Sequence, residues 1–346
     1  MATIKDIARS LGISVSSVSM ALNDSKEIGE KTKRRVREKA NELNYVKNGS
    51  AIDLQRKKTN TVLFITDDPT SSYFVDALSV LEKAIEKFSL DLVIVTSNEH
   101  KSESSVRFLS EQRADAVVCW SQFIDDEVLS SCASERMPIF VLGRRLEKLT
   151  NPYIFNVPIN RNRAGEEMTE FLIAEGFKNI IFVHNENNSI GSIYRMDGFN
   201  RVIKAHQEVS GRIINVNGAG YDDGYRVTEE KLIPIIEKSM ADAIFYSNDN
   251  QAIGGLHCLL EQGFSVPQDI SIVGYSNYPI SKMVYPKITT VNLHEKEMMK
   301  KTADGLIHLL FENKSVEAIK TELSNHSMNS EVIVRNSTLM KENLNE

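Results

Sequence analysis

Apolar and polar positions alternate with a helical period over the first 46 residues. The first predicted helix has one apolar face, formed by residues three and four positions apart: Ile4, Ile7, Ala8 and Leu11. Thr3 and Asp6 have the spacing of a capping box, which predicts that the helix begins there. Gly12 tolerates a positive φ, so it predicts the end of the helix.

A second short helix is predicted directly after this turn. Ser14 can cap it, and Val18 and Leu22 are expected to point inward. Two short helices joined by a turn with glycine form a scaffold that lays the second helix in a DNA major groove. From periodicity alone, the alternative is an ordinary two-helix corner of a small core.

Residues 30–44 fit a third helix that supports the first two. Its buried stripe consists of Val36, Ala40 and Leu43. Basic side chains on the outer face would attract phosphates without reading a base sequence. The side chains expected to face mostly outward are Lys31, Lys33, Arg34, Arg35, Arg37 and Lys39.

From Thr61 onward, short apolar β-branched runs alternate with amphipathic stretches such as Val75–Ser89. Continuous apolar strands separated by helices are typical of parallel sheets covered on both faces. Eight such units predict an α/β core of two doubly wound subdomains rather than one sheet. Ligands bind at the carboxyl ends of strands in such folds, so a cleft between the subdomains is expected. The predicted strands are residues 61–66, 91–96, 115–119, 138–142, 179–183, 212–216, 242–247 and 271–274.

Charge is divided unevenly along the chain. Residues 1–58 hold 13 basic and 7 acidic residues, whereas the remainder holds 28 basic and 40 acidic residues. A basic head on an acidic body is expected if only the head meets a polyanion, although a basic surface without a partner would look the same.

The cysteines and the apolar runs bear on the compartment. Cys119, Cys132 and Cys258 have no CxxC spacing, so they are expected to be reduced packing residues. The chain shows no apolar signal region and no run of the ~18 apolar residues that a membrane span requires. We therefore expect a cytoplasmic protein without membrane contact.

Two sets of longer strings carry a family resemblance. DIARSLGISVSSVSMALN, followed by KTKRRVREKANELNYVKN, resembles the N-terminal headpiece of the LacI/GalR family of bacterial transcriptional regulators. RMDGF at 195–199, SNDNQAIGGL at 247–256 and DISIVGYSN at 269–277 resemble its effector-binding core, which is itself similar to periplasmic sugar-binding proteins. The resemblance covers nearly the whole chain. It implies a homodimeric repressor that binds double-stranded operator DNA and is controlled by a small-molecule effector.

The expected organisation follows the family. An all-α helix-turn-helix headpiece (1–46) precedes a hinge helix and linker (47–58), an N-terminal core subdomain (59–159 and 290–320) and a C-terminal core subdomain (160–289 and 321–346).

The resemblance places base contacts on the second helix. Val15 and Ser16 match base-contacting positions, and so does Met20 one turn later, where many family members have arginine. Arginine reads guanine bidentately, which Met20 cannot do, so we expect weak direct readout supported by DNA deformability. The alternative is that Met20 packs inward. Phosphate contacts are implied for Thr3, Ser14, Ser17, Ser19, Asn23, Thr32 and Tyr45.

Asn48 can cap a helix of one or two turns, which is too short to be stable alone. The resemblance implies a hinge helix that forms on operator DNA, with Leu54 wedged into the minor groove beside the small Ala51. Lys47 stands where the family often has proline, and Gly49 weakens helix propensity, so this hinge should depend especially on DNA. The alternative is a plain linker.

Arg195 matches the position at which family members clamp the effector, and its guanidinium suits a carboxylate, a phosphate or sugar hydroxyls. The alternative is a structural salt bridge. Asn248 matches a ligand-contacting asparagine, and the aromatic candidates for ring stacking or contact are Tyr73, Phe74 and Tyr221.

Two positions depart from the family. Ser276 replaces the aspartate that commonly holds ligand hydroxyls, and Asn160 replaces an aspartate that begins the second subdomain. The loss of carboxylates with Arg195 retained predicts an anionic effector, such as a phosphorylated or acidic sugar. The alternative is a degenerate pocket.

Catalytic motifs are absent from the sequence. The seven histidines form no HxH or HExxH spacing, and there is no P-loop or G-x-S-x-G elbow, so we expect no enzyme, cofactor or metal. Asp67 and Asp68 follow a predicted strand and are expected to be a solvated pair. A small-molecule receptor without DNA function is the alternative, but it would have an export signal and no basic head.

Overall fold

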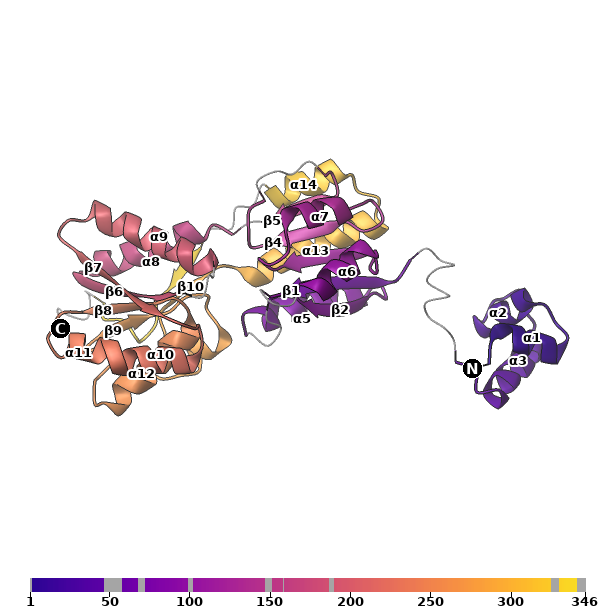
Figure 1. Cartoon of the computed structure of the whole chain (residues 1–346), viewed down its shortest axis with the longest axis horizontal. Helices are drawn as coiled ribbons and strands as arrows, with labels where there is room; N and C mark the ends of the chain where they lie inside the picture. The colour runs from indigo at the N-terminus through magenta and orange to yellow at the C-terminus, as the bar shows by residue number, and fades with distance from the viewer. Residues whose placement is uncertain are drawn as a thin grey trace. The chain divides into compact units, whose positions relative to one another are not determined.

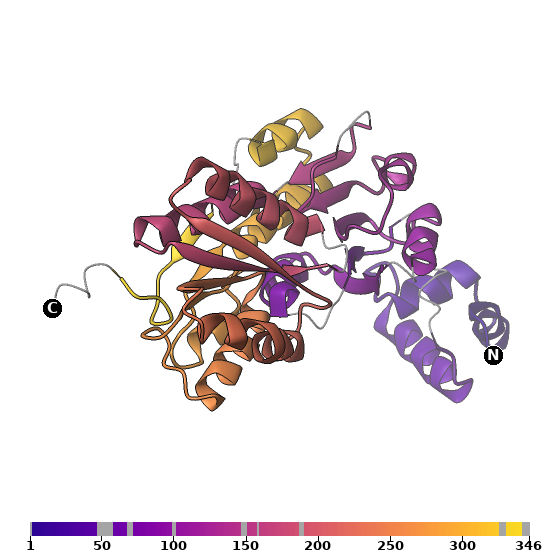
Figure 2. The same ribbon diagram turned by 60° about the vertical axis from the view of Figure 1, so that its left-hand side comes forward.

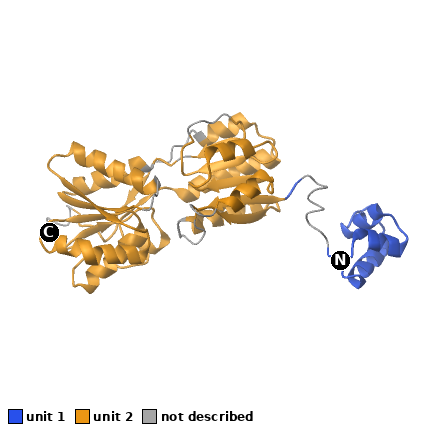
Figure 3. Ribbon diagram, in the orientation of Figure 1, with its two compact units in different colours: residues 1–59 blue, residues 60–346 orange. Residues whose placement is uncertain are grey.

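The computed structural model describes residues 2–46, 58–67, 72–98, 102–146, 151–157, 159–186, 190–324 and 330–340. The chain forms two compact units, Met1–Thr59 and Asn60–Glu346 (Figure 3). The predicted hinge residues Asn48, Ala51 and Leu54 lie outside the described residues, and so do Lys47 and Gly49.

The first unit is the three-helix headpiece that the periodicity predicts, with α1 (Ile4–Leu11), α2 (Val15–Leu22) and α3 (Glu30–Glu42). Thr3 and Asp6 form the capping box of α1, and Gly12 ends it at φ 64°. Ser14 caps α2 by accepting the Ser17 N–H at 3.0 Å. The small core consists of Ile7, Ala8, Val18, Ala21, Val36 and Ala40.

Lys33 corrects one expectation about α3. Its outer face carries exposed Arg34, Arg35 and Arg37, but Lys33 is only 5% exposed. Its ammonium group lies 2.8 Å from a Glu30 carboxylate oxygen and 3.1 Å from one of Asp24. A buried lysine stem is tolerated because the charged end has two acidic partners at the rim of the headpiece.

The first sheet of the second unit is parallel and has the strand order β2-β1-β3-β4-β5. Its strands are β1 (Thr61–Thr66), β2 (Asp91–Thr96), β3 (Ala116–Trp120), β4 (Ile139–Leu142) and β5 (Ile154–Val157). One face packs on α5 (Ser72–Glu86), α13 (Glu295–Phe311) and α14 (Val316–Ser324). The other packs on α6 (Glu103–Ser110) and α7 (Asp126–Cys132). Coverage of both faces is the doubly wound arrangement expected from continuous apolar strands.

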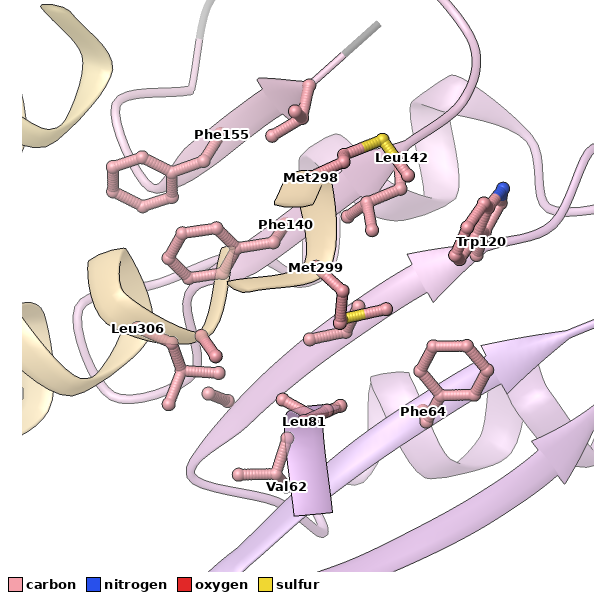
Figure 4. Packing of buried hydrophobic residues seen from close by; sticks show 14 of the residues in the cluster. Val62, Phe64, Leu81, Trp120, Phe140, Leu142, Phe155, Met298, Met299 and Leu306 are labelled. Atoms are coloured by element: carbon pink, nitrogen blue, oxygen red, sulfur yellow. The ribbon is translucent and has the colours of Figure 1, made fainter. Parts of the chain in front are cut away.

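Figure 4 shows the core between this sheet and α13. Met298 of α13 lies beside Leu142, Met299 lies between the sheet residues Phe140 and Phe64, and Leu306 belongs to the same cluster. The rings of Phe140 and Phe155 stack with centroids 4.6 Å apart across neighbouring strands. The ring packing fixes β5 to β4, although β5 is only four residues long.

The second sheet is also parallel and has the order β7-β6-β8-β9. Its strands are β6 (Asn179–Asn185), β7 (Ser210–Val216), β8 (Ala243–Tyr246) and β9 (Ser271–Val273). Helices α8 (Arg161–Ala174) and α9 (Ile190–Ala205) cover one face, and α10 (Tyr221–Val227), η1 (Thr228–Leu232), α11 (Ile233–Ile236) and α12 (Asp249–Glu261) cover the other. All eight predicted strands are present, with limits shifted by no more than two residues.

Late parts of the chain return to both sheets. Figures 1 and 2 show the yellow helices α13 and α14 beside the strands of the first sheet. Strand β10 (Thr290–Asn292) pairs antiparallel with β11 (Glu331–Ile333), and η2 (Pro279–Lys282) lies between β9 and β10 in the sequence. Val291 and Leu293 pack with the second sheet, whereas Leu323 packs with the first. We therefore propose subdomain crossovers a few residues after the expected limits at 290 and 320.

Candidate functional site

The exposed face of α2 collects the residues expected to meet bases. Val18 and Ala21 point into the headpiece core, so the opposite side of this helix carries the expected base contacts Ser16 and Met20. The expected phosphate contacts Ser19 and Asn23 lie beside them, and Val15 lies in the first turn. Val15 is 41% exposed, and Met20 is half-buried without joining the headpiece core. These positions form one continuous helix surface of the kind that enters a groove.

Hydroxyl groups gather where α2 begins. The Ser14 Oγ lies 2.7 Å from the Ser16 Oγ and 2.8 Å from the Ser17 Oγ. Backbone N–H groups at a helix N-terminus and neighbouring hydroxyls are suited to phosphate oxygens.

The remaining predicted phosphate contacts lie elsewhere on the headpiece. Thr3 is exposed and caps α1, and Thr32 lies half-buried in the first turn of α3. Tyr45 packs against the headpiece core, and its N–H donates to the Ala40 carbonyl at 2.8 Å.

A second candidate site is a cavity of about 220 Å³ at the carboxyl ends of strands from both sheets. Its wall on the side of the first sheet follows β1, β3 and β4, and its other wall follows β6, β8 and β9. This is the position at which parallel sheets bind ligands. The lining consists of Asp67, Phe74, Trp120, Ser121, Gln122, Leu142, Gly143, Arg144, Asn185, Gly191, Arg195, Ala219, Asn248, Ser276, Tyr278 and Leu293.

Four of the predicted effector residues meet in this cavity: Phe74, Arg195, Asn248 and Ser276. Two others are not part of its lining. Asn160 caps α8 by accepting the Arg163 N–H at 3.3 Å, and the Tyr221 hydroxyl lies 2.8 Å from His257 Nδ1. Tyr73 belongs to α5, but its side chain lies outside the described residues.

Arg195 is held by the close approach of two helices. It lies on α9, is 9% exposed, and its guanidinium stacks 4.4 Å above the ring of Tyr275. A Cβ on Gly165 would lie 2.6 Å from the Arg195 carbonyl oxygen, and one on Gly198 would lie 2.3 Å from the Asn162 carbonyl oxygen. Only glycine at both positions lets α8 and α9 touch, which brings Arg195 to the cavity wall.

Asn248 connects the cavity to the second sheet. Its carbonyl oxygen accepts the Gln251 N–H at 2.9 Å, which caps α12, and its amide donates to the Ala219 carbonyl at 3.0 Å. The side chain therefore has a fixed orientation at the cavity wall before any ligand binds.

Sequence reasoning missed several cavity residues that directly follow strands of the first sheet. Arg144, two residues after β4, places its guanidinium 2.7 Å from an Asp126 carboxylate oxygen and donates to the Ile124 carbonyl. Trp120 ends β3, and Asp67, expected to be solvated, is half-buried in the lining. Their position at the ends of predicted strands could have identified them, because parallel sheets bind ligands there.

Arg144 and Arg195 thus come from opposite sides of one cavity, and Asp67 is the acidic side chain among the described residues of its lining. Burial raises the pKa of the Cys119 thiol to about 11, which leaves it protonated at neutral pH. Across the described ranges, no three His, Cys, Asp or Glu side chains gather to hold a metal ion. None of the helices that the structure describes is both long and apolar enough to span a bilayer.

A helix-turn-helix surface on one unit and a cavity between parallel sheets on the other define a DNA-binding regulator with a ligand-binding core. Residues 3–48 match the bacterial regulatory proteins of the lacI family, and residues 169–338 match the periplasmic binding protein-like domain. The chain belongs to the LacI family of bacterial transcriptional regulators.

Individual relatives cover nearly all of the chain. It is 29% identical over 345 residues to the probable HTH-type transcriptional repressor ExuR of Bacillus subtilis, covering 97% of this chain and 98% of ExuR. A LacI-family regulator from Silicibacter pomeroyi has a similar structure with a TM-score of 0.76 and 22% identity, covering 97% and 99% of the two chains. The structure of the lac repressor dimer bound to operator and the anti-inducer ONPF is similar with a TM-score of 0.72 and 20% identity. The match covers 98% of this chain and 99% of the lac repressor chain. These relatives are transcriptional regulators, not enzymes.

Proposed function

We propose that this regulator is a homodimeric repressor whose operator affinity is set by an anionic small molecule in the cavity between its two sheets. The observation that carries the proposal is the placement of Arg144 and Arg195 in one cavity lining. Ser276 belongs to the same lining, at the position where the family resemblance implies an aspartate. A guanidinium on each side suits a carboxylate or phosphate that reaches both subdomains.

The cavity supports an acidic sugar more than a neutral one. Phe74 and Trp120 offer an apolar wall, with ring centroids 5.2 Å apart, and Asn248 and Ser276 offer polar groups. Asp67 and Asp126 are the nearby carboxylates, and Asp126 is already paired with Arg144. An anionic ligand supplies the negative charge that this cavity lacks at Ser276, where the family commonly has an aspartate.

Calorimetry on the full chain tests the effector class directly. D-glucuronate, D-glucose 6-phosphate and D-glucose share one ring and differ in charge. We expect one of the two acids to bind, and Arg195→Ala to remove that binding. Tight binding of D-glucose with no binding of either acid would contradict the proposal.

The headpiece supports operator binding with weak direct readout. Val15 and Met20 offer apolar contact, for example to a thymine methyl group, and Ser16 offers a hydroxyl. Specificity then depends on DNA deformability and on the segment 47–58, which lies outside the described residues. Selection from a randomised duplex pool should give a site without a strong guanine preference. A sharp guanine preference that disappears in Met20→Ala would contradict this account.

A homodimer fits the operator geometry. One headpiece reads a half-site, and two headpieces related by a two-fold axis read a palindrome whose half-sites lie on the same side of the duplex. The lac repressor in the similar structure is a dimer on its operator. Sedimentation of the full chain should give a species of twice the chain mass, and a selected operator should be palindromic. A regulator of this kind works in the cytoplasm, where bacterial DNA lies.

A further inference from the structure

A fully buried carboxyl group lies directly behind the cavity wall. Asp249 begins α12 immediately after Asn248 and is 0% exposed. One of its oxygens accepts the Thr290 hydroxyl at 2.6 Å, and the other accepts the Tyr278 N–H at 2.6 Å. Its own N–H donates to the Tyr275 carbonyl at 3.1 Å. One residue is therefore bonded to the turn after β9 and to β10.

The turn that Asp249 holds has an unfavourable backbone. Ser276 has φ 91° and Asn277 has φ 49°, in the left-handed region that residues with a side chain avoid. The Ser276 N–H donates to the Val291 carbonyl at 2.9 Å, and the Asn277 N–H donates to the Thr290 hydroxyl at 3.1 Å. Such a conformation persists only where surrounding bonds fix it, and Asp249 supplies or supports several of them.

Both sides of this turn face cavities. Ser276 and Tyr278 line the ligand cavity, and they also line a second cavity of about 290 Å³ together with Asn277 and Arg335. The Arg335 guanidinium donates to the Asn277 side-chain oxygen at 2.6 Å, and its backbone N–H donates to the Thr289 hydroxyl at 2.9 Å. The turn is thus clamped between Asp249 on one side and Arg335 on the other.

We propose that Asp249 is a positioning residue for ligand binding, which fixes the turn 276–278 against its unfavourable backbone and ties it to β10. The inference rests on the proposed function, because Asn248, Ser276 and Tyr278 matter here as parts of the ligand cavity. Strand β10 leads within a few residues to α13 on the first sheet, so a ligand contact at the turn is mechanically linked to the segment that joins the two sheets.

The charge surroundings of Asp249 fit a role that depends on its protonation. Burial raises its pKa to about 7, although the Thr290 hydroxyl, the Tyr278 N–H and the Arg335 charge favour the ionised form. Arg335 is the charged side chain that acts on it, and the other groups facing it from β10 and from the turn are neutral. An ionised carboxylate accepts both hydrogen bonds, whereas a neutral amide at this position accepts only one of them well.

The test compares two aspartates that each accept two hydrogen bonds. Asp249→Asn removes one of the two hydrogen bonds that Asp249 accepts, from Tyr278 or from Thr290, with almost no change of volume. Asp242 is the matched control because it accepts the N–H groups of Lys178 and Asn179, each at 2.9 Å, at the opposite end of β6. Hydrogen exchange of the full chain, followed by mass spectrometry, is measured for wild type, Asp249→Asn and Asp242→Asn.

In Asp249→Asn, we expect the amides of residues 276–278 to exchange at least tenfold faster, while those of β6 and β8 stay as in wild type. Asp242→Asn should leave residues 276–278 unchanged. Equal exchange at the turn in wild type and Asp249→Asn would overturn the inference, and so would a uniform increase through the second sheet. The latter result would assign Asp249 to general stability alone.

A ligand measurement separates this inference from the proposed function. With whichever of D-glucuronate and D-glucose 6-phosphate binds wild type, Asp249→Asn should weaken affinity about tenfold, and the ratio of the two affinities should grow above pH 7. Asp242→Asn should stay within about twofold of wild type. Unchanged affinity in Asp249→Asn would overturn the inference. If neither acid binds wild type, the proposed effector class fails, and the exchange experiment alone decides the role of Asp249.

Discussion

Replacing Ser276 by aspartate returns a carboxylate to the ligand cavity and should weaken binding of an anionic effector. Ser276 lines the cavity of about 220 Å³, so the new charge and a ligand charge bound there lie on the order of 7 Å apart. At an effective dielectric constant of about 20, two like charges at that distance repel by about 2 kcal/mol, or roughly 30-fold in affinity. The backbone at φ 91° accepts aspartate at least as readily as serine, so the variant should fold.

Ser276→Asn is the matched control, because it has the same shape as aspartate without the charge. Calorimetry with D-glucuronate, D-glucose 6-phosphate and D-glucose should show the roughly 30-fold loss for the bound acid only in Ser276→Asp. Binding of D-glucose should be unchanged or stronger in that variant. Equal losses in the two variants would mean that shape, not charge, governs the site, and the reasoning would be refuted.

Three further predictions concern stability and pH. Gly198→Ala should lower the unfolding free energy in urea by about 1–3 kcal/mol, because its Cβ meets the Asn162 carbonyl oxygen at 2.3 Å; an unchanged midpoint would contradict the α8–α9 packing. Ser14→Ala removes the cap of α2 and should lower headpiece stability by about 1 kcal/mol in calorimetry, while Ser16→Ala should not. Asp249 binds a proton more tightly in the folded chain, so its contribution to stability falls as pH rises from about 4 to about 7. Asp249→Asn should therefore gain stability relative to wild type as pH rises from about 4 to about 7; a constant difference would speak against a raised pKa.

The helices and strands with a clear hydrophobic pattern were predictable. Those that depend on contacts between residues far apart in the sequence were not. Strand β5 was missed because the sequence IFNV offers only two consecutive apolar residues before a polar one. In the structure, Asn156 is stable within this strand because its side chain donates to the carbonyls of Val141 and Arg144 at 3.1 and 2.8 Å. A polar residue within a strand is stable when neighbouring backbone groups satisfy its side chain, and sequence alone does not show which groups lie nearby.

The candidate site was partly predictable for a related reason. Arg195, Asn248 and Ser276 follow from family motifs. Gly198 belongs to the same motif as Arg195, and with Gly165 it forms the contact of α8 and α9. Arg144 was missed because the sequence does not show whether the loop after β4 turns toward the cavity. Only the tertiary structure places Arg144 in the cavity lining. Lys33 was placed outward because a basic residue is usually exposed, and only the fold brings Asp24 to it.

Operator affinity of the full chain with and without ligand tests the central claim most directly. Fluorescence anisotropy with a selected duplex measures Kd for wild type and for Arg195→Ala, each with and without a saturating concentration of the acid that binds. We predict that the acid changes the wild-type Kd by at least about fivefold and leaves that of Arg195→Ala unchanged. An identical Kd for wild type with and without the bound acid would contradict the account.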